Sequence, residues 1–161
     1  MPGTGDRRIV VQREVATEPA AVFALLADPR RHPEIDGSGT VRAAADAEPI
    51  TGTGQVFVMD MDLTAVGHAE LSDYQTENHV VEFVPDELLT WATARRGNVP
   101  AGVRWSWALH RSAPGRTRVV HTCDWSRVTD PAVLARVTFP RIPADRLEQT
   151  LQRLADAVEP R

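Results

Sequence analysis

Residues 103–125 constrain the fold of this chain most, because two alternating segments flank a short run of turn residues there. In the first segment, a period of two places Trp105, Trp107 and Leu109 on one face and polar side chains on the other. Successive side chains of a strand point to opposite faces of a sheet, so this pattern predicts a strand with one apolar face.

The second segment alternates in the same way, and its inward parity holds Val119, His121, Cys123 and Trp125. The two apolar faces coincide only if the connection has odd length, for example residues 113–115 with the glycine at positive φ. The predicted register pairs Leu109 with Val119, Trp107 with His121 and Trp105 with Cys123. A slip of one residue would expose the tryptophans. An imidazole therefore lies among indole rings, on a surface that needs a cover or a ligand.

Chain length and composition indicate a globular protein. The 161 residues suffice for one domain, with 42% hydrophobic and 25% charged side chains. We expect residues 1–7 to form a frayed tail and residues 8–161 to form a single domain. No apolar run approaches the roughly 20 residues of a membrane span, and the start lacks a secretory signal. We therefore expect a cytoplasmic protein without membrane insertion.

The charges argue against nucleic acid as a partner. The net charge is −4, and all 18 basic residues are arginines scattered among acidic residues. Cys123 is the single cysteine, which excludes an internal disulfide and a cysteine-based zinc site and favours a small buried side chain. The five histidines are dispersed and no phosphate-binding loop is found, so we expect neither metal nor cofactor. A monomer and a homodimer remain open.

The remaining pattern is a strand, two short helices, several strands and a long helix. Thr17 is the expected N-cap of the first helix, and Leu147, Leu151, Leu154 and Val158 give the last helix an apolar stripe that needs a sheet. The expected strands are 9–16, 40–45, 54–62, one starting within 67–72, 74–84, 89–93 and the hairpin; the expected helices are 20–27, 30–36, a short turn from Asp130 to Val137, and the segment after Pro143.

Several segments carry a resemblance to a known superfamily. They are residues 19–28 (PAAVFALLAD), 32–41 (HPEIDGSGTV), 81–85 (VEFVP), 115–119 (GRTRV) and Asp124-Trp125. Together they resemble the START/Bet v 1-like (SRPBCC) superfamily, and within it the polyketide cyclase/dehydrase and lipid-transport branch. The resemblance spans residues 8–158.

This resemblance implies an α+β helix-grip fold. One curved antiparallel sheet of about seven strands would wrap around the long C-terminal helix, with two short helices after the first strand. It also implies a deep, largely apolar cavity for polyketides, lipids, sterols or plant-hormone-like molecules. No catalytic residue is carried over, because the superfamily has no shared catalytic motif.

The residues themselves supply the candidate site. Parity places large apolar and aromatic side chains on the inner face, where they form either an ordinary core or the wall of a ligand cavity. The candidate ligand-binding residues are Phe57, Met59, Met61, His79, Phe83, Trp91, Trp105, Trp107 and Trp125, together with His32 and Asp36. The last two lie one helical turn apart, where they either meet at the cavity mouth or form a local hydrogen bond.

His121 and Arg13 are the catalytic candidates. An imidazole titrates near neutrality, and desolvation of His121 would lower its pKa; the alternative is a core histidine with a backbone partner. Arg13 interrupts an apolar strand face, where it either holds a ligand oxyanion or extends past the strand end. The sequence thus predicts binding of a small hydrophobic molecule, with two alternatives: cofactor-independent cyclisation or dehydration of a polyketide-like substrate, or a carrier or sensor without turnover.

Overall fold

The computed structural model describes residues 6–44 and 46–160 of the chain. In chain order the elements are β1 (Arg8–Val15), α1 (Pro19–Leu26), η1 (Pro29–Arg31), α2 (His32–Ile35), β2 (Val41–Ala43), β3 (Val56–Met61), η2 (Thr64–Val66), η3 (Ala69–Leu71), β4 (Tyr74–Val84), β5 (Leu88–Arg95), β6 (Arg104–Ala113), β7 (Arg116–Asp124), α3 (Pro131–Arg136) and α4 (Ala144–Val158), where η marks a 3₁₀ helix.

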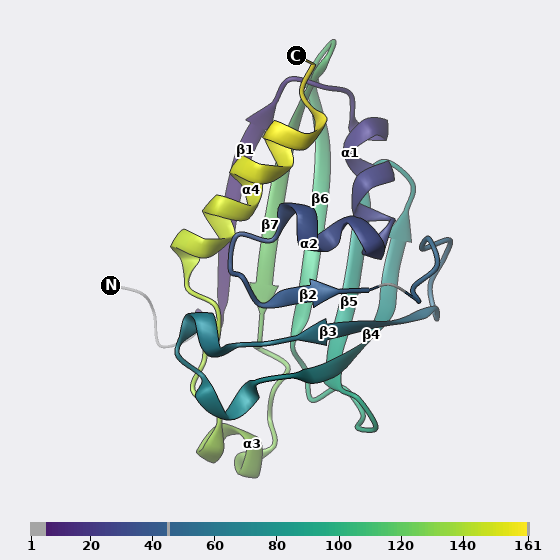
Figure 1. Ribbon diagram of the computed structural model, residues 1–161. Helices are drawn as coiled ribbons and strands as arrows, with labels where there is room; N and C mark the ends of the chain where they lie inside the picture. The colour runs from purple at the N-terminus through teal and green to yellow at the C-terminus, as the bar shows by residue number, and fades with distance from the viewer. Residues whose placement is uncertain (1–5, 45, 161) are drawn as a thin grey trace.

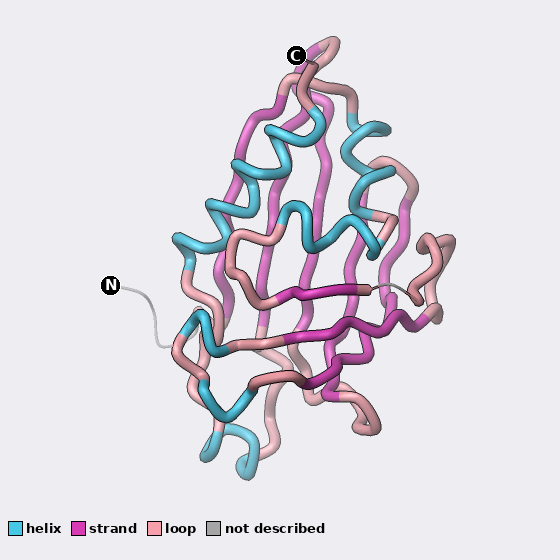
Figure 2. Tube along the Cα trace, viewed as in Figure 1, coloured by secondary structure: helices cyan, strands magenta, loops and turns pink. Residues whose placement is uncertain are grey.

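The strands form one seven-stranded sheet in the order β1-β7-β6-β5-β4-β3-β2, and each neighbouring pair is antiparallel. Figure 1 shows that the sheet is strongly bent, so that β2 and β3 run across the direction of β1, β7 and β6. The helices α1, α2 and α4 lie on the concave side of the sheet (Figure 2). This α+β arrangement confirms the predicted helix-grip fold.

The hairpin register is confirmed: Leu109 pairs with Val119, Trp107 with His121, and Trp105 with Cys123. The odd connection takes a form that the sequence did not specify. A two-residue turn, Pro114-Gly115, joins the paired residues Ala113 and Arg116, and a register shift follows between Ala113 and Arg111. Gly115 has a φ of 72°, as a tight turn of this kind requires. The bulge restores the parity that places both tryptophans on the concave face.

A second register shift changes the inner face of β4. Before it, Val80 pairs with Trp91, and after it, Glu82 pairs with Thr90. Because one extra residue is inserted, the inward parity changes from Asn78 and Val80 to Phe83. The sequence places both His79 and Phe83 on the inner face, and this is wrong for His79, in the first half of β4.

Two local predictions need correction. The cap of α1 is Glu18 rather than Thr17, and its carboxylate is engaged with Arg111 and the Gly115 amide instead of the helix. Residues 67–72 hold the 3₁₀ helix η3 and no strand start, because the chain turns there between β3 and β4. Of the predicted tail, residues 1–5 lie outside the described residues, whereas Arg7 donates to the Val128 carbonyl at 2.8 Å.

Helix α4 packs its apolar stripe on the sheet as predicted. Leu147, Leu151 and Leu154 are buried, and Val158 is partly buried against the same core. The helix makes its most extensive contact with β1 and also packs against α2. No helix of the described residues is long and apolar enough to cross a membrane.

Gly37 joins the loop after α2 to α4. Its amide donates to Thr150 Oγ1 at 2.9 Å, and a Cβ at this position would lie 2.6 Å from the Thr150 nitrogen and 2.8 Å from the Arg146 oxygen. Real Cβ atoms do not approach backbone atoms this closely. Glycine is therefore required here by close approach, although its φ is not positive.

We expect Gly37→Ala to lower the free energy of unfolding by about 3 kcal/mol, because α4 must move away from the loop to admit the methyl group. Urea unfolding followed by circular dichroism measures this loss. Gly52→Ala is the matched control, since a Cβ there meets nothing within 4 Å and the φ is not positive. A Gly37→Ala protein as stable as the control would contradict the described loop–helix packing.

Candidate functional site

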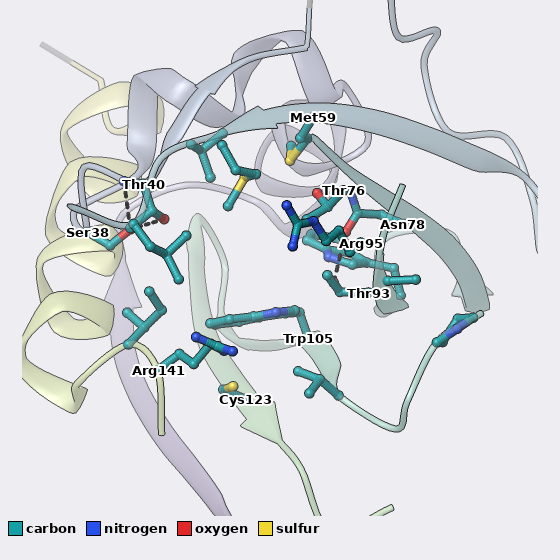
Figure 3. Close-up of a pocket in the computed structure, with 18 of the residues that line it drawn as sticks. Ser38, Thr40, Met59, Thr76, Asn78, Thr93, Arg95, Trp105, Cys123 and Arg141 are labelled. Atoms are coloured by element: carbon teal, nitrogen blue, oxygen red, sulfur yellow. Dashed lines mark hydrogen bonds between the residues drawn. The ribbon is translucent and has the colours of Figure 1, made fainter. Parts of the chain in front are cut away.

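The concave face of the sheet and the helices enclose a pocket of about 1040 Å³. Its wall includes eight of the predicted site residues: His32, Asp36, Met59, Met61, Trp91, Trp105, Trp107 and His121. They come from α2 and the residue that follows it, and from β3, β5, β6 and β7, so the bent sheet brings together side chains that are far apart in the sequence. Figure 3 shows the Trp105 indole lying flat beside the open space.

The pocket has a deep end and a mouth. The deep end is formed by Trp107, His121 and His32, each no more than 6% exposed. The mouth is formed by the loop after β5, where Val99 is 85% exposed, and by α3. Figure 2 shows this loop and α3 together at the lower end of the molecule, opposite the chain's C-terminal end. A ligand therefore has an exit at one end and aromatic rings at the other.

His121 lies in a stack of aromatic rings. Its ring centroid is 3.6 Å from that of Trp107 and 5.6 Å from that of Trp105, with interplanar angles of 17° and 24°. Nδ1 is 3.0 Å from the Ser106 carbonyl oxygen, which only accepts, so Nδ1 donates and Nε2 carries the lone pair. Nε2 makes no hydrogen bond to the described residues.

Burial lowers the pKa of His121 from 6.5 to about 4, although the Ser106 hydrogen bond opposes the shift. The predicted direction is thus confirmed. In the unfolded chain the ring takes up a proton at a higher pH than in the folded protein, so protonation favours unfolding. The contribution of neutral His121 is present above about pH 6.5 and is lost as the pH falls towards 4.

We expect this linkage to amount to about 3 kcal/mol, since each pKa unit corresponds to about 1.4 kcal/mol. The free energy of unfolding of the wild type and of His121→Gln is measured with urea at pH 7 and at pH 4. Between these two pH values the free energy of unfolding of the wild type should fall by about 3 kcal/mol more than that of the variant, because glutamine does not titrate. An equal change of the free energy of unfolding with pH in the two proteins would show that His121 is not buried as described.

His32 is the second buried histidine of the pocket. Its Nε2 lies 2.7 Å from the Leu26 carbonyl oxygen, and its ring stacks on Trp91 at 5.3 Å with an interplanar angle of 19°. Burial lowers its pKa as well, so the ring is neutral at pH 7. The backbone bond to Leu26 gives His32 a role in joining α1 to α2, beside its place in the pocket wall.

Asp36 lies in the wall, but its carboxylate holds the loop before β2. Oδ1 accepts from the amide and the hydroxyl of Ser38, and Oδ2 accepts from the amides of Thr40 and Val41 at 2.9 and 2.8 Å. His32 and Asp36 were predicted to lie close together. Their only hydrogen bond among the described residues is the helical one that the Asp36 amide donates to the His32 carbonyl. Both oxygens of Asp36 already have partners.

A polar strip crosses β4 and β5 within the otherwise apolar wall. Thr93 Oγ1 donates to Asn78 Oδ1 at 2.8 Å, and Asn78 Nδ2 donates to Thr76 Oγ1 at 3.2 Å (Figure 3). Thr76 and Asn78 were not predicted as wall residues, because the bulge between Val80 and Glu82 reverses the parity of this part of β4. A bulge has no reliable sequence signal. The pairing of polar side chains on adjacent strands is likewise visible only in the structure.

His79 and Phe83, both on β4, are absent from the pocket wall. His79 points to the opposite face, where Nε2 is 4.0 Å from Glu77, because β4 has the other parity there. Phe83 has the inward parity but packs edge-on against Phe23 of α1, at a centroid distance of 5.4 Å. The structure therefore does not bring these two predicted ligand-binding residues into the wall of this pocket.

Phe57, Trp125 and Arg13 also lie outside the pocket wall. Phe57 is buried behind Trp91, in edge contact at 5.3 Å. Trp125 stacks on Phe139 at 5.9 Å, where the chain has left the sheet. Arg13 is exposed on the edge strand β1. This agrees with the alternative prediction, in which the arginine extends past the strand end into solvent. The structure therefore places Arg13 away from the pocket in which it was predicted to hold a ligand oxyanion.

Tyr74, Arg95 and Arg141 are further residues of the wall that the sequence did not predict. The Arg95 guanidinium lies over the Tyr74 ring, 5.8 Å from its centroid. Arg141 precedes α4 in an irregular segment, for which the sequence pattern indicates no orientation. Cys123 also lines the pocket, and burial raises the pKa of its thiol to about 12, so the group is a neutral thiol.

The chain matches the family described as polyketide cyclase / dehydrase and lipid transport over residues 6–159. It is also 33% identical over 156 residues to uncharacterized protein Rv0088 of Mycobacterium tuberculosis H37Rv, in an alignment that covers 94% of this chain. The chain spans 64% of the length of that relative.

Solved structures agree on the fold. Protein CV1439 of Chromobacterium violaceum superposes with a TM-score of 0.64 at 16% identity, covering 96% of this chain and 99% of that one. The major latex-like protein 151 of Panax ginseng superposes with a TM-score of 0.60 at 11% identity, covering 95% and 97%. With the family match over residues 6–159, these likenesses confirm the resemblance seen in the sequence: the chain belongs to the polyketide cyclase / dehydrase and lipid transport family of the START/Bet v 1-like superfamily.

Proposed function

We propose that this protein binds a small, largely hydrophobic molecule, of polyketide, lipid or sterol type, in the pocket between the bent sheet and the helices. The observation that carries the proposal is the aromatic part of the pocket wall, where the indole rings of Trp105 and Trp107 and the neutral ring of His121 lie in one stack. Membership of a family described by polyketide and lipid chemistry supports it.

The physical properties of the wall favour such a ligand. A volume of about 1040 Å³ lies at the upper end of what small-molecule sites enclose. Flat aromatic rings and the flexible side chains of Met59 and Met61 adapt to flat or irregular apolar bodies. The polar strip of Thr76, Asn78 and Thr93 provides a few fixed hydrogen-bonding groups in this wall, and such groups orient a ligand.

A second candidate function is cofactor-independent cyclisation or dehydration of a polyketide-like substrate. One observation favours it. His121 lines the pocket, and its Nε2 carries a lone pair and has no hydrogen-bond partner among the described residues. One observation weighs against it, because a ring with a pKa of about 4 is a weak base at neutral pH. Binding is therefore the better supported function, and turnover requires a ligand group that raises the basicity of His121.

Binding is tested with the purified protein and an apolar fluorescent probe, after native mass spectrometry has shown which small molecules it retains. We expect Trp107→Phe to weaken probe binding several-fold through lost contact area, and Trp125→Phe to leave it unchanged. Both variants keep an aromatic ring. Nε1 of Trp107 has no partner among the described residues, so phenylalanine removes no hydrogen bond there.

The control is informative because Trp125 is also buried but does not line the pocket, and it stands behind Phe139, which does. Equal effects of the two variants on probe affinity, or a wild-type protein that retains and binds no apolar molecule, would overturn the proposed function.

A further inference from the structure

We propose that the ligand is an amphipathic anion, whose oxyanion head group is held at the pocket mouth by Arg95 and Arg141 while its apolar body lies over Trp105. This inference rests on the proposed function and adds the charge class of the ligand. Figure 3 shows the two guanidinium groups turned towards the open space from different elements, Arg95 from the end of β5 and Arg141 from the segment before α4.

These two arginines, with Arg136 of α3, are the positive charges of the pocket wall, and none of the three is paired. Among the described residues, no carboxylate lies within 4.0 Å of their guanidinium groups, and those groups donate no hydrogen bond to protein. Arg111 has such a partner in Glu18 at 2.8 Å, whereas Arg13 and Arg118 also have none among the described residues, so the feature that sets Arg95, Arg136 and Arg141 apart is their place in the pocket wall. The wall thus contains positive charges that no carboxylate of the described residues neutralises.

The acidic residues of the wall cannot take that place. Asp36 accepts four hydrogen bonds from residues 38–41, and Asp130 caps α3 by accepting from the Ala132 amide at 2.9 Å. With three arginines, two aspartates and two histidines that burial keeps neutral, the wall carries a net charge of 3 − 2 = +1. The whole chain carries −4, so this local excess of positive charge is a property of the pocket.

Tyr74 adds a neutral donor beside the cations. Burial raises the pKa of its phenol to about 12, even though Arg141 and Arg95 act in the opposite direction. The hydroxyl therefore keeps its proton at pH 7. A carboxylate or phosphate accepts from such a donor and from a planar guanidinium at once, and hydrogen bonds of this charge-assisted kind are the stronger ones.

The experiment compares ligands that share one apolar chain. Isothermal titration calorimetry at low salt measures the affinity of the wild type for dodecanoate, dodecyl phosphate and dodecanol, with acetate as the oxyanion without a chain. We expect the two anions to bind at least about tenfold more tightly than dodecanol, and acetate to bind too weakly to detect. Raising the salt concentration should weaken the anions and leave dodecanol unchanged.

Arg141→Gln tests the assignment, and Arg118→Gln is its control with the same change of net charge. Arg118 is exposed on β7, outside the pocket wall. We expect Arg141→Gln, and independently Arg95→Gln, to remove most of the preference for the anions and to leave dodecanol affinity within about twofold. Circular dichroism confirms that each variant is folded.

The outcomes separate this inference from the proposed function. Equal affinity of the wild type for dodecanol and the anions, or an anion preference that Arg141→Gln and Arg95→Gln both retain, would overturn the anionic head group while binding of apolar molecules stands. A wild type that binds none of the three chain compounds would count against both. A preference for dodecanoate over dodecyl phosphate, or the reverse, identifies the oxyanion.

Discussion

Removal of residues 144–161 is expected to abolish cooperative folding, because α4 closes one side of the core. Leu147, Leu151 and Leu154 are at most 3% exposed, and each buried leucine contributes about 1.5–3 kcal/mol. Their sum of roughly 5–9 kcal/mol is comparable with the whole stability of a typical domain, about 5–15 kcal/mol. Circular dichroism and urea unfolding measure the outcome.

Two point variants show that the effect belongs to the buried stripe. We expect Leu154→Ala to lower the free energy of unfolding by about 3 kcal/mol, and Glu148→Ala, on the exposed face of the same helix, to change it by less than about 0.5 kcal/mol. A truncated protein that still unfolds cooperatively would disprove the role of α4 as the helix that the sheet surrounds.

Any cyclisation or dehydration that this pocket catalyses is expected to slow about 100-fold in His121→Gln, whereas ligand affinity changes little. Glutamine keeps the size and some hydrogen bonding but cannot take up a proton. Product analysis with a polyketide-like substrate, together with a binding titration, measures the two quantities separately. His79→Gln is the matched control, because His79 lies outside the pocket wall.

Unchanged product formation by His121→Gln would remove this ring from the chemistry and leave it a role in the wall alone. The same loss of turnover in His79→Gln would show that the effect arises from general destabilisation.

The strand pairing of the hairpin was predictable because its signal is strong and local. Burial of both tryptophans restricts the register of β6 and β7, and together with a short connection of odd length it predicts the pairing of Trp107 with His121. The stripe on α4 was predictable for a similar reason, since Leu147, Leu151 and Leu154 recur at the helical period.

The composition of the pocket wall was less predictable, because it depends on events with no signal in a single sequence. One inserted residue near Val81 reverses the parity of β4, which removes His79 from the wall and places Asn78 in it. The arginines show the same limit. Arg13 has the right parity but lies on an edge strand and is exposed, whereas Arg141 reaches the pocket from an irregular segment.

NMR of the tryptophan side chains tests most directly whether a small molecule binds beside the indoles of the concave face. The chain has four tryptophans, so the indole N–H region of a ¹⁵N-labelled sample holds few signals, which single Trp→Phe variants assign. Titration with a molecule that the protein retains should shift the Trp105 and Trp107 signals strongly and the Trp125 signal little. Saturating ligand that shifts Trp125 most, or leaves Trp105 and Trp107 unchanged, would contradict the account.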